Sequence, residues 1–173
     1  MSNILFTEAE IQLAVKSIAN KINDGHSISD ELSPVFICVL NGAFMFFSDL
    51  TKEIKFNFSI DFLKAKSYVG QKSGKLQITK DIEVNILHRK VYLIDDIYDS
   101  GQTINTLIEH LEKYLPEEII PITLFKKQHT PAPSNLIYGI ELTDESFLVG
   151  YGLDNSKGHQ RNLKYILGEQ SQD

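Results

Sequence analysis

Three carboxylates, two hydroxyls and one glycine lie within nine consecutive positions, directly after a short apolar run. They belong to Asp95, Asp96, Asp99, Ser100, Gly101 and Thr103. Gly101 permits a tight turn, and backbone N–H groups, the two hydroxyls and the N-terminus of a following helix would together attract a phosphate. The adjacent acids can instead accept hydrogen bonds from the vicinal hydroxyls of a sugar or hold a hydrated Mg²⁺. The stretch therefore predicts a site for a ribose that carries a phosphate.

Strand-like and helix-like segments alternate around this stretch and must position it. Continuous apolar runs typical of parallel strands covered on both faces occur at residues 35–40, 91–94 and 119–125. Apolar residues recur at helical spacing in residues 8–25, 44–51 and 104–111, and Thr7 and Glu10 can form a capping box before the first of these segments. We therefore predict an α/β fold with a central, mainly parallel sheet flanked by helices. The acidic pair would follow a strand at the edge where such sheets bind ligands.

The remaining segments are less regular. Polar residues alternate with Phe56, Phe58, Ile60 and Phe62, which predicts an edge or antiparallel strand. Residues 64–75 are polar and contain two glycines, so we expect a mobile loop with a returning arm at residues 78–84. A short final strand is predicted at residues 147–149.

Composition limits the class of protein. The 173 residues are 42% hydrophobic, which predicts a single domain, residues 1–173. The net charge of −6 gives no basic field for nucleic acid or an anionic membrane surface, and no apolar window is long enough to cross a bilayer. We therefore expect a cytoplasmic protein that binds neither. Cys38 lies inside an apolar run and is expected to be a buried core thiol, and the scattered histidines give no zinc motif.

The stretch from Ile94 to Thr103 resembles the phosphoribosyltransferase signature, in which an apolar strand precedes two acids, two apolar residues and an acidic-hydroxyl-glycine-any-threonine loop. It resembles the hypoxanthine-guanine phosphoribosyltransferases in particular, because Asp99 stands where several other members carry alanine. The resemblance implies a type I phosphoribosyltransferase fold with a small hood built from both chain ends. It also implies that Asp99 is the acid/base at purine N7. Ribose and 5′-phosphate would be bound by Asp95, Asp96, Asp99, Ser100, Gly101, Gln102 and Thr103.

Matches to the same family continue along the chain. Residues 40–50 look like its pyrophosphate-binding turn and following helix, which implies pyrophosphate contacts from Asn41 and Gly42, although the family usually has Lys or Arg in place of Asn41. Asn41-Gly42 could also be a plain turn. Ser67 and Tyr68 match the serine-tyrosine pair of a flexible loop that closes over the reacting centre.

The C-terminal half supplies the implied purine site. Lys126 matches a lysine that donates to the purine O6, Phe147 an aromatic that stacks on the base, and Leu148 a residue whose backbone reads the purine edge. Asp154 matches an aspartate that positions base and metal. Arg161 matches an arginine that meets pyrophosphate, at a spacing one residue longer than usual. A solvated lysine, a core strand and a surface arginine are the structural alternatives for these positions.

The resemblance therefore predicts an enzyme of purine salvage. It would transfer the phosphoribosyl group from phosphoribosyl pyrophosphate to a 6-oxopurine, hypoxanthine first, with Mg²⁺ held by Asp95, Asp96 and Asp154. It also suggests a homodimer or homotetramer. Two alternatives remain open: a xanthine- or guanine-specific enzyme, and a regulator that binds phosphoribosyl pyrophosphate without turnover. Many purine members carry glutamate in place of Asp95.

Overall fold

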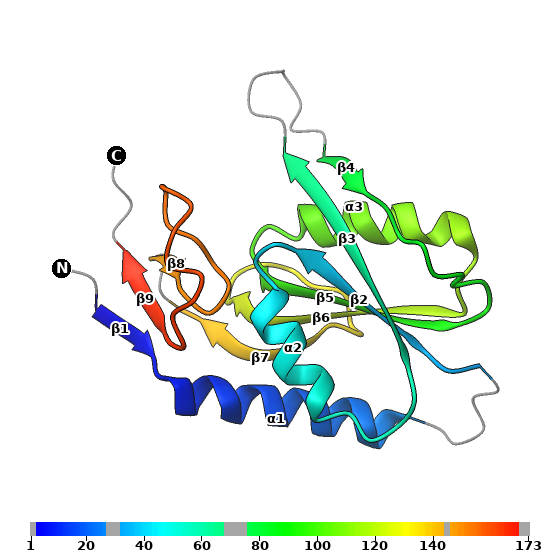
Figure 1. Cartoon of the computed structure of the whole chain (residues 1–173), viewed down its shortest axis with the longest axis horizontal. Coiled ribbons are helices and arrows are strands. Elements are labelled where there is room, and N and C mark those ends of the chain that lie inside the picture. Colours follow the sequence, from blue (N-terminus) through cyan, green and yellow to red (C-terminus); the bar gives the residue numbers. More distant parts are fainter. Residues whose placement is uncertain (1–2, 27–31, 68–75, 144–145, 170–173) are drawn as a thin grey trace.

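The computed structural model describes residues 3–26, 32–67, 76–143 and 146–169. Its larger sheet has six strands in the order β4-β3-β2-β5-β6-β7 (Figure 1). Every neighbouring pair is parallel except β3 and β4. The strands are β2 (Val35–Leu40), β3 (Ser59–Ser67), β4 (Leu76–Lys80), β5 (Lys90–Tyr98), β6 (Glu118–Lys127) and β7 (Ile137–Leu142). The prediction of a mainly parallel central sheet is confirmed.

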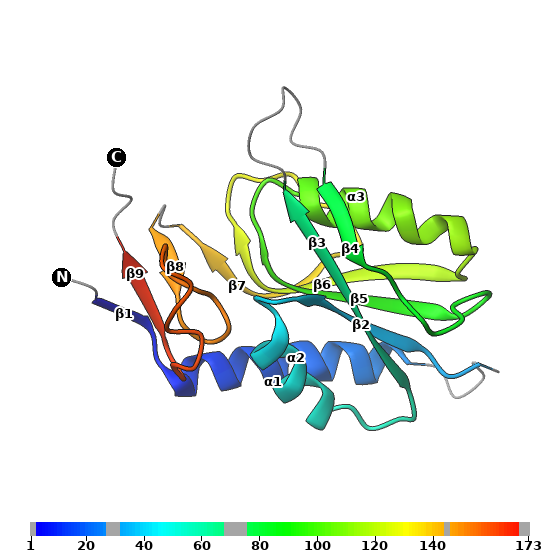
Figure 2. The same ribbon diagram turned by 45° about the horizontal axis from the view of Figure 1, so that its top comes forward.

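Helices cover both faces of this sheet. Helices α1 (Glu8–Gly25) and α2 (Phe44–Lys52) lie on one face, and α3 (Gln102–Leu111) lies on the other, followed by the short 3₁₀ helix η1 (Glu112–Tyr114) (Figures 1 and 2). Strand β2 explains the arrangement, because Phe36 and Cys38 pack toward α1 and α2, whereas Ile37 packs toward α3. The predicted capping box of Thr7 and Glu10 is present at the start of α1.

A second, antiparallel sheet stands at one end of the molecule. It joins the N-terminal strand β1 (Asn3–Phe6) to β9 (Ile166–Glu169) and β8 (Phe147–Val149), in the order β1-β9-β8 (Figure 1). We call this sheet, together with the connecting residues 150–165, the hood. Strands β1 and β9 have four residues each, too few for a periodic sequence signal, and β9 makes the prediction of β8 as the final strand wrong.

The region around β3 agrees with the sequence prediction only in part. β3 pairs antiparallel with β4, but it runs parallel to β2 and is not the edge strand, because β4 takes that place. The expected loop at residues 64–75 is also too long, because β3 continues to Ser67 and β4 begins at Leu76. Tyr68 lies outside the described residues. Asp61 is one of the polar residues in the alternating pattern, yet it is only 6% exposed. Its carboxylate can be buried because it accepts hydrogen bonds from the backbone N–H groups of Phe62, Glu83 and Val84.

The structure bears on the expected core position of Cys38 and on membrane-spanning helices. Cys38 is fully buried, and burial, followed by the charges of Asp95 and Asp96, raises the pKa of its thiol to about 12. The expected core thiol is confirmed. Within the described ranges, no helix is long and apolar enough to span a membrane.

Candidate active site

Three neighbouring strands bring several of the predicted site residues together at the carboxyl ends of the sheet strands. Strands β2, β5 and β6 are adjacent and parallel, so the turn after β2, the loop after β5 and Lys126 at the end of β6 share that end of the sheet. The chain leaves β2 for α2 on one face and leaves β5 for α3 on the opposite face. Connections that diverge in this way open a crevice at the carboxyl ends of the strands, where α/β sheets bind ligands.

Asp95 and Asp96 lie inside β5 rather than after it, because the strand runs on to Tyr98. Asp95 is 7% exposed, and its Oδ1 accepts a hydrogen bond of 2.9 Å from the backbone N–H of Asp96. Burial and then the charge of Asp96 raise the pKa of Asp95 well above its ordinary value. Burial likewise raises the pKa of Asp96 to about 6, although the backbone N–H of Ile97 and the charge of Arg161 oppose the rise. Two carboxylates are thus held where ionisation is costly.

The turn after β2 packs directly against the second acid. A Cβ atom on Gly42 would lie 1.5 Å from Oδ2 of Asp96, so a side chain at this position would displace the Asp96 carboxylate. Asn41 is exposed, and the Leu40–Asn41 peptide bond is cis. The turn and the acidic pair therefore form one continuous surface.

The loop after β5 leads into α3 with a glycine as its N-terminal cap. Gly101 has φ +78°, and a Cβ there would lie 2.4 Å from the hydroxyl oxygen of Tyr98. Gly101 has no side chain to cap the helix, and the hydroxyl of Ser100 accepts only a long bond of 3.4 Å from the N–H of Gln102. The side-chain capping of α3 is therefore weak, and the start of a helix is a place where backbone N–H groups can bind an anion. Thr103, half-buried, lies in the first turn.

Asp99 stands at the exposed rim of the same loop. Its side chain is 60% exposed, and its Oδ1 lies 2.9 Å from Nζ of Lys127. Its carbonyl oxygen accepts a hydrogen bond from the hydroxyl of Thr130. The ion pair and the backbone bond fix the direction of a carboxylate that is open to solvent.

Lys126 is 8% exposed, which excludes the solvated-lysine alternative. Its ammonium donates to the carbonyl oxygens of Lys127 at 3.1 Å and Gln128 at 3.4 Å, and to Oε1 of Glu141 at 3.1 Å. It also lies 5.5 Å from the ring centroid of Tyr138. Glu141 and Tyr138 belong to β7, a strand that sequence reasoning missed, so no sequence signal pointed to these partners.

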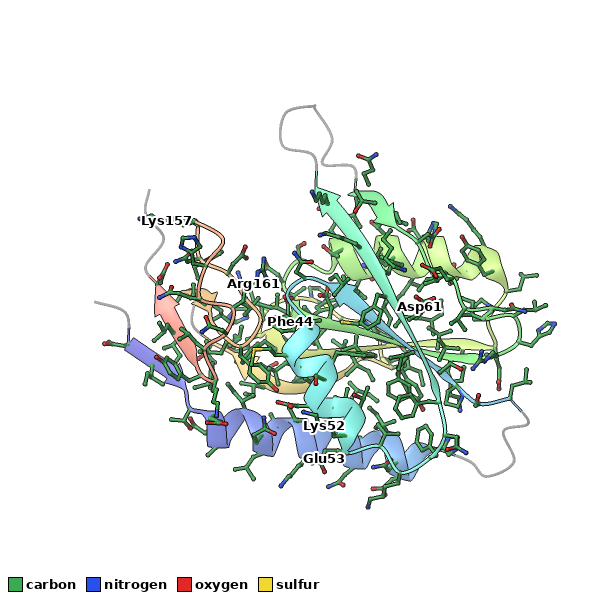
Figure 3. The ribbon with its side chains drawn as sticks, in the orientation of Figure 1. Phe44, Lys52, Glu53, Asp61, Lys157 and Arg161 are labelled. Atoms are coloured by element: carbon green, nitrogen blue, oxygen red, sulfur yellow. The ribbon has the colours of Figure 1, made fainter. Side chains whose placement is uncertain are left out.

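The hood approaches the site through its connecting loop. Arg161 lies 2.5 Å from Oδ2 of Asp154 and donates to the carbonyl oxygen of Gly152 at 2.5 Å. A Cβ on Gly152 would lie 2.1 Å from the carbonyl oxygen of Gly42, so the loop touches the turn after β2. Figure 3 shows Arg161 on the side of the hood that faces Phe44, at the start of α2. The surface-arginine alternative for Arg161 is thus disfavoured by its contacts.

Neighbouring residues of β8 have opposite exposures. Phe147 is 52% exposed, whereas Leu148 is 7% exposed and Val149 is fully buried. The core-strand alternative therefore holds for Leu148 and fails for Phe147, whose aromatic ring is open to solvent. An exposed aromatic ring offers a stacking surface.

The three predicted metal ligands do not form a cluster. In the part of the chain that the structure describes, no group of three or more His, Cys, Asp and Glu side chains could hold a metal ion. Asp154 is paired with Arg161, which leaves Asp95 and Asp96 as adjacent carboxylates. Mg²⁺ retains several waters and commonly binds through one or two carboxylates plus substrate phosphates, so this pair fits it.

An open α/β sheet carries an acidic pair on one strand and a glycine turn at the start of the following helix, at the carboxyl ends of the strands where such sheets bind ligands. Residues 2–156 match the family model of the phosphoribosyl transferase domain, and the chain therefore belongs to that family. It is 33% identical to the hypoxanthine-guanine phosphoribosyltransferase of Bacillus subtilis, over 96% of this chain and 92% of that protein. It is 31% identical to the hypoxanthine-guanine-xanthine phosphoribosyltransferase of Tritrichomonas foetus, over 96% and 90%.

A solved structure agrees with these relatives. The crystal structure of a hypoxanthine-guanine phosphoribosyltransferase from Bacillus anthracis, with a HEPES molecule in its active site, superposes with a TM-score of 0.87 at 33% identity. The match covers 97% of this chain and 98% of the other. The type I phosphoribosyltransferase fold predicted from the sequence is confirmed.

Proposed function

We propose that this protein transfers the 5-phosphoribosyl group from phosphoribosyl pyrophosphate to a 6-oxopurine, with hypoxanthine as the first candidate and guanine as the second. The products are the purine nucleotide 5′-monophosphate and pyrophosphate. The observation that carries the proposal is the glycine-capped start of α3 beside the buried Asp95 and the half-buried Asp96, because a phosphate and a ribose diol need these two neighbouring groups.

The sugar phosphate and the pyrophosphate would occupy different parts of the site. The 5′-phosphate is assigned to the loop of residues 99–103, where backbone N–H groups and hydroxyls converge at a helix N-terminus. The carboxylates of Asp95 and Asp96 accept hydrogen bonds from the ribose hydroxyls. The pyrophosphate is assigned to the Asn41–Gly42 turn, with Arg161 nearby as a cation that lowers the pKa of Asp96.

The purine would lie between the loop after β5 and the hood. Phe147 stacks on its ring, the backbone of Leu148 reads its edge and Asp154 positions it. Lys126 donates to O6: its bond of 3.4 Å to Gln128 is the longest of three and is the one a purine oxygen would replace. A 6-amino group would face the ammonium donor to donor, at a cost of about 1–3 kcal/mol, so adenine should be a poor substrate.

Catalysis would combine positioning with proton removal. Breaking the bond between ribose C1 and pyrophosphate develops oxocarbenium character, so the base nitrogen must be held close to C1. The purine loses a proton as the new bond forms, and the Asp99 carboxylate, exposed and oriented by Lys127, accepts it at N7. Ser67, the last residue of β3, and the next residue, Tyr68, are proposed to help exclude water from the reacting centre.

Mg²⁺ is proposed as the metal, with Asp95 and Asp96 as its protein ligands and Asp154 as a contact through substrate or water. The cation supplies charge neutralisation to the leaving pyrophosphate. Two carboxylates with raised pKa values suit this role, because a nearby cation favours their ionised form.

The test is an assay of four bases. Purified protein is incubated with phosphoribosyl pyrophosphate and Mg²⁺, and mononucleotide formation is followed with hypoxanthine, guanine, xanthine or adenine. We expect turnover of 6-oxopurines only, loss of turnover with chelator, and a fall of about 10²–10⁴-fold in Asp99→Asn. Asp24→Asn, an exposed aspartate near the end of α1, is the matched control and should keep full activity. Conversion of adenine alone, or of no base at all, would refute the assignment.

A further inference from the structure

A buried tyrosine of the hood reaches into the helical layer. Tyr151 is 3% exposed, and its hydroxyl donates a hydrogen bond of 2.7 Å to Oδ2 of Asp49 on α2. The same oxygen accepts a bond of 2.8 Å from Nε2 of Gln12 on α1. Nζ of Lys52, labelled on α2 in Figure 3, lies 2.9 Å from the other oxygen of Asp49. Three segments that are distant in the sequence thus meet at one carboxylate.

The charges at this contact are fixed by its surroundings. Burial would raise the pKa of the Asp49 carboxyl, but hydrogen bonds from Lys52, Tyr151 and Gln12 outweigh it, and the pKa lies below its ordinary value. Burial, followed by the hydrogen bond to Asp49, raises the pKa of Tyr151. Near neutral pH the tyrosine is therefore a donor and the aspartate a charged acceptor, which is the stronger kind of hydrogen bond.

The backbone around Tyr151 has an unusual path that needs a support. Tyr151 has φ +46°, a left-handed conformation that is uncommon for a bulky residue, and it stands between Gly150 and Gly152 at φ +105° and +101°. The N–H of Tyr151 bonds to the carbonyl of Leu163, and the N–H of Gly152 bonds to that of Arg161. The buried side chain and its bond to Asp49 hold this turn from the other side.

The pair connects the two halves of the candidate site. Asp49 lies on the helix that follows the Asn41–Gly42 turn, and Tyr151 directly precedes Gly152, whose Cα packs against the Gly42 carbonyl. Two residues further along the hood loop is Asp154, paired with Arg161. Any drift of the loop away from α2 would therefore separate the pyrophosphate turn from the loop that carries these two charged side chains.

We propose that Tyr151 and Asp49 are a positioning pair that holds the hood loop, with Asp154 and Arg161, against the Asn41–Gly42 turn. The kinetic consequence rests on the proposed function, because this turn and this loop are assigned there to pyrophosphate and purine. Neither residue touches the reacting atoms. Their effect reaches the substrates through the placement of Gly152 and its neighbours.

Tyr151→Phe removes only the hydroxyl and is the first variant to test. We expect kcat/KM to fall by about tenfold to a hundredfold, because small displacements of positioning groups have effects of this size. Hydrogen exchange at the amides of Tyr151 and Gly152 should become faster. Tyr114→Phe is the matched control: its hydroxyl also bonds to an aspartate, Asp81 at 2.9 Å, and it should change neither quantity.

A double-variant cycle separates positioning from plain stability. Asp49→Ala should reproduce the kinetic loss of Tyr151→Phe, and the double variant should be no worse than either single variant. Asp49→Asn keeps an oxygen that can accept from Tyr151 and should lose less than Asp49→Ala. Unchanged kcat/KM and exchange in Tyr151→Phe, or additive losses in the double variant, would overturn the proposal. If the unmodified protein converts no base, the proposed function fails, while the exchange measurement still decides whether the pair holds the loop.

Discussion

Asp95 and Asp61 have nearly equal exposures and opposite environments. Asp61, 6% exposed, accepts three backbone N–H bonds, and these bonds with the charge of Lys80 outweigh burial and lower its pKa. Asp95, 7% exposed, accepts one and is followed in the chain by the charged Asp96, so burial and the neighbouring charge raise its pKa. Asp61 therefore stabilises the fold at neutral pH, whereas Asp95 destabilises the metal-free protein. A carboxylate retained at such a cost is typical of a binding site.

Neutral replacement should separate these two roles. With chelator present at pH 7.5, Asp95→Asn should raise the free energy of unfolding by about 1–3 kcal/mol and abolish turnover, whereas Asp61→Asn should lower it by a similar amount. The Asp95 effect should shrink toward pH 4, whereas the Asp61 effect should persist there and shrink only at lower pH. The cost of ionising Asp95 disappears below its unfolded pKa, and the benefit from Asp61 is lost as pH falls through its lowered folded pKa. Denaturant unfolding at both pH values measures this, and the same sign for both variants would contradict it.

Strand β8 shows how one short element serves two purposes. Consecutive residues of a strand point to opposite faces, so Phe147 is exposed while Leu148 is buried between the hood and the core. Sequence alone assigned an aromatic residue and an apolar residue to the same strand. The pairing with β9 decides which face each side chain takes.

Truncation of the two neighbours should therefore have different effects. Phe147→Ala should raise KM for the base about tenfold, since stacking of a base on an aromatic ring contributes roughly 1–3 kcal/mol, and should leave stability nearly unchanged. Leu148→Ala should lower the free energy of unfolding by about 2–5 kcal/mol. Steady-state kinetics and denaturant unfolding of both variants measure the contrast. A stability loss in Phe147→Ala as large as that in Leu148→Ala would show that its ring belongs to the core.

At the scale of the whole molecule, the site depends on contact between the hood and the main sheet. That contact includes the approach of Gly152 to the Gly42 carbonyl and the bond between Tyr151 and Asp49. Asp95, Asp96, the loop at residues 99–103 and the Asn41–Gly42 turn come from the main sheet, and Phe147, Asp154 and Arg161 come from the hood. A change that separates the two parts should reduce activity without touching any proposed catalytic group.

Two glycines in the hood loop provide a matched test. Gly152 and Gly158 both have left-handed φ values, +101° and +77°, but an added Cβ overlaps the Gly42 carbonyl at Gly152 and meets nothing within 4 Å at Gly158. Gly158→Ala should cost about 1–2 kcal/mol of stability from its backbone alone and keep full turnover per folded molecule. Gly152→Ala should cost more and lower kcat/KM at least tenfold. Equal kinetics in the two variants would mean that the contact does not position the site.

The sequence by itself predicted the main helices and the buried parallel strands, because periodic apolar residues act over short distances. The assignment of the glycine-hydroxyl turn to a phosphate stays a prediction. The sequence also indicated the family, since the residues from Ile94 to Thr103 carry their chemistry in one continuous segment. The short strands β1 and β9 and the half-buried β7 carry no such signal, and β3 was expected as an edge or antiparallel strand although it lies inside the sheet between β2 and β4. Such strands are stabilised by partners, which a local pattern does not reveal.

Only the tertiary structure decided which distant residues complete the site. Lys126 is paired with Glu141 in the β6–β7 register, and Gly42 packs against both Asp96 and Gly152. The Tyr151 hydroxyl donates to Asp49, which is 102 positions away in the sequence. Each of these contacts joins segments whose sequence spacing is arbitrary, so no motif can encode it. The physical reason is that strand order and helix packing, rather than chain distance, set which carboxylates are buried, paired or left for a ligand.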